Sequence, residues 1–215
     1  MKWTDLICHV VALLGWPLLL TAQPAKPLAG RVTAYLANRI GDYEGLQLRT
    51  ASGTVRVRFP PHTAAQVLRQ APIGQTVVAT VSGEPIRPPR HEVTNQAEAE
   101  PTYRLVHIQN QVKKTGVRLA DLPPPPPAPG RLVDTDGPLT GALHDDAGRL
   151  SALLISQYII ALKPHQSESI QALLTGVTRL GVVGYERTEP GFVNKTGRKL
   201  IHPTILLING QTFAL

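Results

Sequence analysis

The sequence has little sulfur and few aromatic residues. Of its 215 residues, Cys8 is the only cysteine, and it lies in an apolar N-terminal stretch. If that stretch is removed, the remaining chain has no thiol, which excludes disulfides, thiolate zinc sites and a cysteine nucleophile. Aromatic residues make up only 5% of the chain, so its cores must consist mainly of Val, Leu, Ile and Ala. The folded parts therefore depend on their own packing.

The residue patterns typical of enzymes and metal sites are also missing. No two histidines beyond the N-terminal stretch have the i, i+4 spacing of a helical zinc site. The sequence contains no Gly-rich phosphate loop and no G-x-S-x-G elbow. We therefore expect a non-catalytic protein that needs no metal and no cofactor.

What the chain has in excess is positive charge, proline and glycine. The net charge is +7, and there are 20 prolines and 18 glycines. The prolines and glycines favour short strands and many turns over long helices. The charge favours nucleic acid, anionic lipid or acidic glycan as partners, although a basic excess also serves to keep a protein soluble.

The first 22 residues resemble a secretory signal. Lys2 supplies a short basic start, Leu6 to Leu20 form an apolar run, and Ala22 follows as a small-residue cleavage site. We expect cleavage after Ala22 and an exported protein, periplasmic or secreted. The alternative is that the segment stays attached as a membrane anchor.

Two segments near residue 50 predict a β-hairpin with a basic face. Leu46–Thr50 and Thr54–Phe59 alternate apolar and polar residues, which is typical of half-buried strands. The residues between them supply the turn. The alternation places four polar side chains on one face: Gln47, Arg49, Arg56 and Arg58. Tyr35 and Tyr43, near the turn before this hairpin, are the only nearby aromatic candidates for stacking on a ligand, and we include Tyr43 in the predicted site.

The element order of the first half is repeated in the second. The first half predicts strands at 30–40, 46–50, 54–59, 76–81 and 103–108, with a helix at 63–70. The second half predicts strands at 137–143, 150–155, 158–162, 179–185 and 204–209, with a helix at 167–174 that starts at Ser167. The motif Phe-Pro-Pro-His (59–62) recurs as Leu-Lys-Pro-His (162–165) before each helix. A duplication explains this pattern most simply.

Three strands, a helix and two more strands is an order that resembles the OB fold, a small five-stranded barrel. We therefore predict a mainly β protein of two tandem OB-like barrels, each with a short helix between the third and fourth strands. The expected domains are residues 28–110 and 137–215, joined by a Pro-rich linker at 111–136.

The resemblance implies a binding function, because OB folds bind oligonucleotides and oligosaccharides on the second and third strands. The first hypothesis is a polyanion, single-stranded nucleic acid or acidic glycan, held by Gln47, Arg49, Arg56, Arg58 and Tyr43. In the second half, Ile159 and Ala161 take the positions of Arg56 and Arg58, which makes that face apolar. Since exposed apolar strips mark interfaces, the second hypothesis is a protein interface there, with the first half, the linker or another chain.

Overall fold

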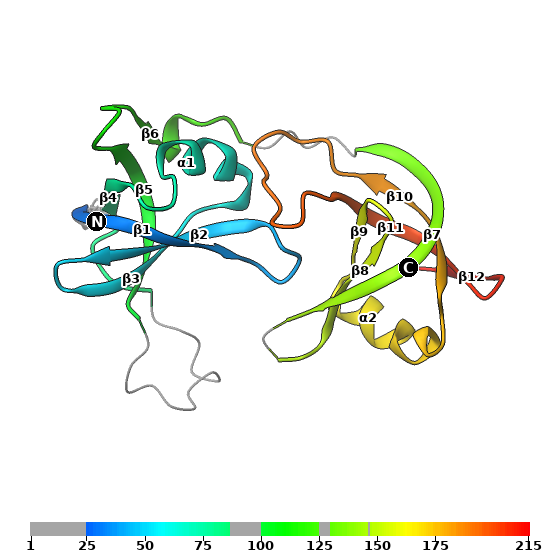
Figure 1. The fold of residues 1–215 in the computed structure, drawn as a ribbon. Helices are drawn as coiled ribbons and strands as arrows, with labels where there is room; N and C mark the ends of the chain where they lie inside the picture. Colours follow the sequence, from blue (N-terminus) through cyan, green and yellow to red (C-terminus); the bar gives the residue numbers. More distant parts are fainter. Residues whose placement is uncertain (1–24, 87–99, 125–129, 146) are drawn as a thin grey trace, which may run out of the picture.

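The structure, a computed structural model, consists of two closed five-stranded β-barrels in tandem (Figure 1). It describes residues 25–86, 100–124, 130–145 and 147–215. The expected signal segment, Met1 to Ala22, lies outside the described residues, as does most of the loop that follows the fourth strand. The prediction of a mainly β fold with two barrels is confirmed.

The first barrel is closed by a parallel pairing between its third and fifth strands. Its strands are β1 (Lys26–Ala37), β2 (Tyr43–Thr50), β3 (Gly53–Arg58), β4 (Thr76–Val81) and β5 (Thr102–Asn110). Neighbouring strands follow the order β3-β2-β1-β4-β5, and β3 pairs with β5 to complete the ring. A short strand, β6 (Gly116–Arg118), is added to the outer edge of β5.

The second barrel has the same strand order and the same parallel closure. Its strands are β7 (Arg131–His144), β8 (Leu150–Ile155), β9 (Tyr158–Ala161), β10 (Arg179–Glu186) and β11 (Lys199–Ile208), with β12 (Gln211–Ala214) added to β11. Written from the third strand, as for the first barrel, the order is β9-β8-β7-β10-β11, and the parallel pairing of β9 with β11 closes the ring. The strand β9 is parallel to β11, as β3 is to β5.

A short helix follows the third strand of each barrel, as the sequence predicts. In the first barrel it is α1 (Ala64–Gln70), and in the second it is α2 (Pro164–Ile170), which continues as a 3-10 turn to Leu174. The predicted start of the second helix at Ser167 is wrong by one turn. Proline is well accommodated at a first helical position, and the side chain of Gln166 accepts the Lys163 N–H at 2.8 Å. Ser167 therefore lies inside the helix.

Two strands of the second barrel begin earlier than predicted. The last barrel strand starts at Lys199 and not at Thr204, because Lys199 to Ile201 pair with β9. The first strand starts at Arg131, which pairs with Glu186 of β10. Together with β6, it takes up much of the linker expected at 111–136. Each extension contains only two consecutive apolar residues, Leu132-Val133 and Leu200-Ile201, between polar residues, and this pattern is too short to predict a strand.

Each barrel is filled by aliphatic side chains from alternate strand positions. Val55 and Val57 of β3 point inward, while Arg56 and Arg58 are exposed. Tyr158 and Ile160 hold the matching inward positions in β9. The first strands also agree in detail, because β1 has bulges after Val32 and Leu36 and β7 has bulges after Leu139 and Leu143. Matching irregularities of this kind support a duplication.

Candidate functional site

The predicted basic face is formed by the second and third strands of the first barrel. In the antiparallel register, Gln47 lies opposite Arg56, and Arg49 lies opposite Thr54. Side chains alternate across a sheet, so these groups share the outer side of the barrel. Arg49, Arg56 and Arg58 are exposed there, and Gln47 is half-buried.

A carboxylate that the sequence analysis did not include lies at the centre of this face. Glu100, just before β5, accepts a hydrogen bond from Arg56 Nε at 2.9 Å and two from Gln47 Nε2 at 3.0 and 3.1 Å. Thr33 of β1 donates to Gln47 Oε1 at 3.0 Å. The bond from Gln47, followed by the bond from Arg56, lowers the pKa of Glu100. The network links polar groups of three strands and the residue that precedes a fourth.

Further arginines extend the basic face on both sides. Arg31 of β1 is paired with Arg49, and Arg104 of β5 is paired with Arg58, in both cases as direct neighbours across the sheet. Arg58 also forms an ion pair with Glu44, with 3.1 Å between Nη1 and Oε1. We define the basic face by its exposed arginines: Arg31, Arg49, Arg56, Arg58 and Arg104. Like charges directly opposite each other disfavour folding, so core stability does not account for this arrangement.

Tyr43 does not take part in this face. Its ring packs edge-to-face on Tyr35, with 5.3 Å between the ring centroids, and both rings contact the hydrophobic core. The Tyr35 hydroxyl donates to the Ala71 carbonyl at 3.1 Å. Tyr43 is thus a half-buried residue that packs on Tyr35, and it is not one of the exposed side chains of the basic hairpin face.

The corresponding face of the second barrel is apolar and is covered by the first barrel. In β8 and β9, Leu154 lies opposite Ile159, as Gln47 lies opposite Arg56. A cluster outside the barrel core joins residues of this face to Ile40, which comes from the turn between β1 and β2; its members include Ala152, Ile159, Leu200, Leu154 and Ala161. Ile159 is fully buried. The structure therefore places Ile159 and Ala161 against the first barrel.

The turn that carries Ile40 is held in a defined conformation. Asn38 accepts the N–H groups of Ile40 and Asp42 on its side-chain oxygen, both at 3.0 Å. Gly41 adopts a positive φ of 87°, which favours glycine. On the second barrel, Ser151 donates its hydroxyl to the Arg39 carbonyl at 2.8 Å. We call residues 38–42 the inserted turn.

The long loop between β10 and β11 of the second barrel reaches back to the inserted turn. Tyr43 donates its N–H to Val193 at 2.9 Å, and Lys195 donates to Gly41 at 2.8 Å. The amide of Asn194 donates to the Ile40 carbonyl and to Asp42 Oδ1, at 2.9 and 3.0 Å. Backbone pairing thus continues from one barrel to the other.

The base of this loop also contacts the start of α1. The Ala65 N–H donates to the Gly191 carbonyl at 2.8 Å, and a Cβ at Gly191 would collide with the His62 carbonyl. Phe192 lies between His62 and Arg187, with the guanidinium carbon 4.0 Å from the ring centroid. The Pro-His motif that precedes α1 therefore contributes to the contact between barrels.

The described residues offer no evidence of a metal centre or a membrane span. Within residues 25–86, 100–124, 130–145 and 147–215, no three His, Cys, Asp or Glu side chains are grouped so as to hold a metal ion. No helix in the described part of the chain is long and apolar enough to cross a membrane. No family model, curated protein or solved structure matches the chain.

Proposed function

We propose that the protein is an exported, non-catalytic binding protein made of two OB-like barrels, and that its first barrel binds a polyanion. The strand order, the parallel third and fifth strands and the helix after the third strand support the OB-like assignment. The polyanion would be single-stranded nucleic acid or an acidic glycan.

The observation that carries this proposal is the set of arginines on four neighbouring strands. Arg31 faces Arg49, and Arg58 faces Arg104. Like charges directly opposite each other across a sheet are unfavourable, so a bound anion would relieve the repulsion between Arg31 and Arg49. Each guanidinium also offers paired donors that match phosphate or carboxylate oxygens. The position of the face, on the second and third strands, is where OB folds bind extended ligands.

In this proposal the second barrel acts as a support. Its equivalent face is apolar and packs on Ile40, so it is not open to a polyanion. The alternative, an envelope or secreted interaction protein that presents this apolar face to another chain, is less well supported because the first barrel already covers it. Support by the second barrel would hold the inserted turn, which leads directly into β2, in one position.

Salt-dependent binding tests the proposal. We would titrate the protein with a fluorescent single-stranded oligonucleotide and with a heparin-like glycan, and follow anisotropy at several salt concentrations. Three phosphate contacts by Arg49, Arg56 and Arg58 should give a log–log salt slope of about −2 on a single strand. Changing all three to Gln should flatten the slope and leave the melting temperature close to that of the wild type.

The matched control removes the same charge elsewhere on the first barrel. Lys113, Lys114 and Arg118 are exposed at and beyond the turn after β5, outside the basic face, and their triple Gln variant should keep the wild-type slope. Equal losses in the two triple variants would mean that net charge alone drives binding. If the wild type shows no salt-dependent binding to either ligand, the polyanion proposal is wrong.

A further inference from the structure

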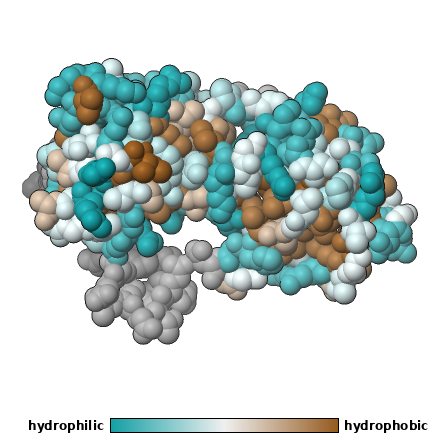
Figure 2. Space-filling model, viewed as in Figure 1, coloured by the Kyte–Doolittle hydropathy of each residue, from teal (hydrophilic) through white to brown (hydrophobic). Residues whose placement is uncertain are grey.

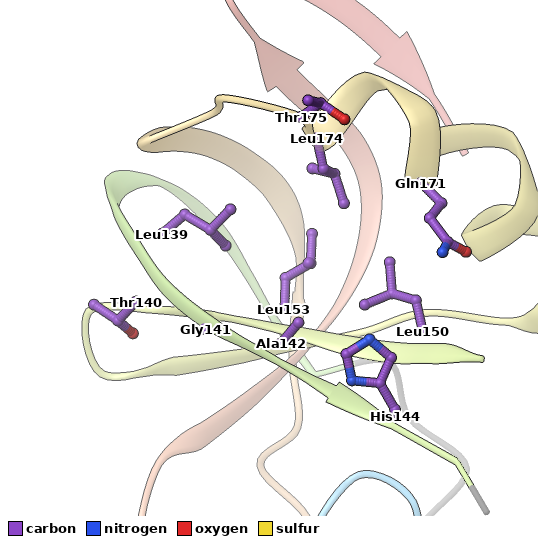
Figure 3. Close-up of a pocket in the computed structure, with 10 residues that line it drawn as sticks. All are labelled: Leu139, Thr140, Gly141, Ala142, His144, Leu150, Leu153, Gln171, Leu174 and Thr175. Atoms are coloured by element: carbon purple, nitrogen blue, oxygen red, sulfur yellow. The ribbon is translucent and has the colours of Figure 1, made fainter. Parts of the chain in front are cut away.

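A groove opens on the second barrel between β7, β8 and the end of the α2 segment. Its volume is about 490 Å³, and four leucines form its apolar walls: Leu139, Leu150, Leu153 and Leu174. Figure 3 shows these side chains around the groove, with His144, Gln171 and Thr175 at its border. In Figure 2, an apolar patch covers this side of the second barrel. The volume is within the range of small-molecule sites, and the mixture of apolar walls and a few polar groups is typical of them.

The duplication tells us what fills the same place in the first barrel. Leu46 and Leu153 are equivalent, because each pairs with the middle of its third strand, at Val57 and Ile160. The partner of Leu46 in the first strand is Tyr35, whereas the partner of Leu153 is Ala142. The matching bulges of β1 and β7 give the same alignment. A tyrosine ring of the first barrel is therefore replaced by a methyl group in the second.

The other residues around the groove follow the same alignment. Tyr43 corresponds to Leu150. Tyr43 pairs with the residue that follows the second bulge of β1, and Leu150 pairs with the residue that follows the second bulge of β7. Ala71 corresponds to Leu174, since each follows its Pro-His motif by the same number of residues. In the first barrel the Tyr35 ring fills this space, stacks edge-on with Tyr43 and donates its hydroxyl to the Ala71 carbonyl. In the second barrel Ala142 is exposed at the groove.

We propose that this groove is a binding site for a small phenolic compound. The ring takes the place that Tyr35 occupies in the first barrel, and the hydroxyl donates to the Leu174 carbonyl. That carbonyl accepts the Val177 N–H at 3.1 Å, and a carbonyl oxygen has a second lone pair for another donor. The remaining volume takes a substituent next to His144 and Gln171. An aromatic ring is favoured because the Tyr35 ring fills the equivalent space of the first barrel.

The site is tested with p-cresol and the full protein labelled at leucine methyl groups. Titration should shift the methyl resonances of Leu139, Leu150, Leu153 and Leu174 in a saturable way, with a Kd on the order of 1 mM. The methyl resonances of Leu46 and Leu48, in the core of the first barrel, should not shift. Toluene, which lacks the hydroxyl, should bind about fivefold more weakly because one hydrogen bond is lost.

Two variants fill the groove from within. Ala142→Tyr restores the residue of the first barrel and should weaken p-cresol binding at least tenfold, and Ala142→Leu should act in the same direction with a smaller side chain. Melting curves establish that each variant is folded, and if Ala142→Tyr does not fold, Ala142→Leu decides. Unchanged binding in a folded variant overturns the proposal.

Two further results would also overturn it. One is the absence of saturable shifts in the wild type at p-cresol concentrations up to the solubility limit. The other is binding of a tyrosine-containing peptide without binding of p-cresol or N-acetyltyrosinamide, which would make the groove a docking site for a polypeptide. None of these results depends on the basic face, so this proposal and the polyanion proposal are tested separately.

Discussion

Arg187 and Asp42 form a bidentate ion pair that joins the two barrels. The distances are 2.6 Å from Nη1 to Oδ2 and 2.8 Å from Nη2 to Oδ1. The Asp42 side chain is 1% exposed and that of Arg187 is 12% exposed. Asn194 donates to the same carboxylate, and Phe192 packs on the guanidinium. A pair this well buried needs all of its partners, because an isolated charge in this position has lost its hydration.

We expect Arg187→Gln to destabilise the protein strongly. Removing one partner leaves the Asp42 carboxylate buried without its counter-ion, which costs about 3–5 kcal/mol of unfolding free energy. Urea unfolding followed by circular dichroism measures this loss. Arg179→Gln is the control, since Arg179 pairs with Asp136 on the open surface, where ion pairs add little. A similar small effect in both variants would show that the ion pair between Arg187 and Asp42 does not contribute to stability.

We expect Ile40→Asp to separate the barrels while each stays folded. Ile40 packs on the apolar face of the second barrel, and a carboxylate there would have to be buried without a partner. Small-angle scattering should show a larger radius of gyration than for the wild type.

The control for this variant is Ile73→Asp. Ile73 is also an apolar residue of the first barrel, but it is 57% exposed, so a carboxylate there remains hydrated. Its scattering curve should match that of the wild type. An unchanged scattering curve for Ile40→Asp would mean that the hydrogen bonds of the long loop hold the barrels together without the apolar cluster.

The tyrosine pair of the first barrel should contribute to stability through both its ring and its hydroxyl. Tyr35→Phe removes the bond to the Ala71 carbonyl and should cost about 1 kcal/mol. Tyr35→Ala also removes the ring and should cost about 3 kcal/mol. Chemical denaturation measures both, and Tyr185→Phe, at an exposed position of β10, should have no effect. Equal losses of unfolding free energy in Tyr35→Phe and Tyr35→Ala would contradict the packing role of the ring.

Acid should weaken the second barrel through Glu186. A hydrogen bond from Lys199, opposed in part by burial and assisted by Arg131, lowers the pKa of Glu186 below its usual value of 4.5. Because the folded pKa is the lower one, the stabilisation is complete above about pH 4.5 and is lost as the pH falls through the folded value. Between pH 7 and pH 3, the free energy of unfolding should decrease less in Glu186→Gln than in the wild type. Glu168→Gln on α2 is the control and should follow the wild type. An identical acid loss in Glu186→Gln would contradict this.

The sequence predicts the features that depend on neighbouring residues. The alternation of apolar and polar residues in Leu46–Phe59 predicts the hairpin. The repeated Pro-His motif predicts the duplication, and through it the apolar positions of Ile159 and Ala161. The partner of that apolar face could not be predicted, because Ile40 is separated from Ile159 by more than half of the chain and lies in a turn. Glu100 was missed for the same reason, since its partners Gln47 and Arg56 belong to another part of the sequence.

The role of Tyr43 illustrates a second limit. An aromatic residue next to a basic hairpin suggests stacking on a ligand, and sequence alone does not show that Tyr35 lies beside it. The contact depends on the register in which β1 pairs with β2, which brings the two rings together. The groove of the second barrel could not be predicted for a similar reason. Ala142 is recognised as a missing ring only when the strand registers align it with Tyr35 of the first barrel.

Glu100 competes with a polyanion for two side chains of the proposed binding site. Its carboxylate binds Arg56 and Gln47, so a polyanion must displace it before Arg56 can bind a phosphate or carboxylate. Glu100→Gln removes the competing charge, and we expect affinity for a single-stranded oligonucleotide to rise about threefold to tenfold. The salt slope should stay close to the wild-type slope of about −2, because Arg49, Arg56 and Arg58 contact the same phosphates in both proteins.

The control is Glu168→Gln, which makes the same change of charge on the second barrel and should raise affinity only slightly through the general field. Low pH offers a second test without mutation. The pKa of Glu100 is lowered by Gln47 and Arg56, so the carboxylate stays charged and competes at pH 7 and at pH 5. Wild-type affinity should approach that of Glu100→Gln only when the pH falls through this lowered pKa. If Glu100→Gln binds no more tightly than the wild type, Arg56 does not contact the polyanion, and the binding site would have to lie on the Arg31 and Arg49 side of the basic face.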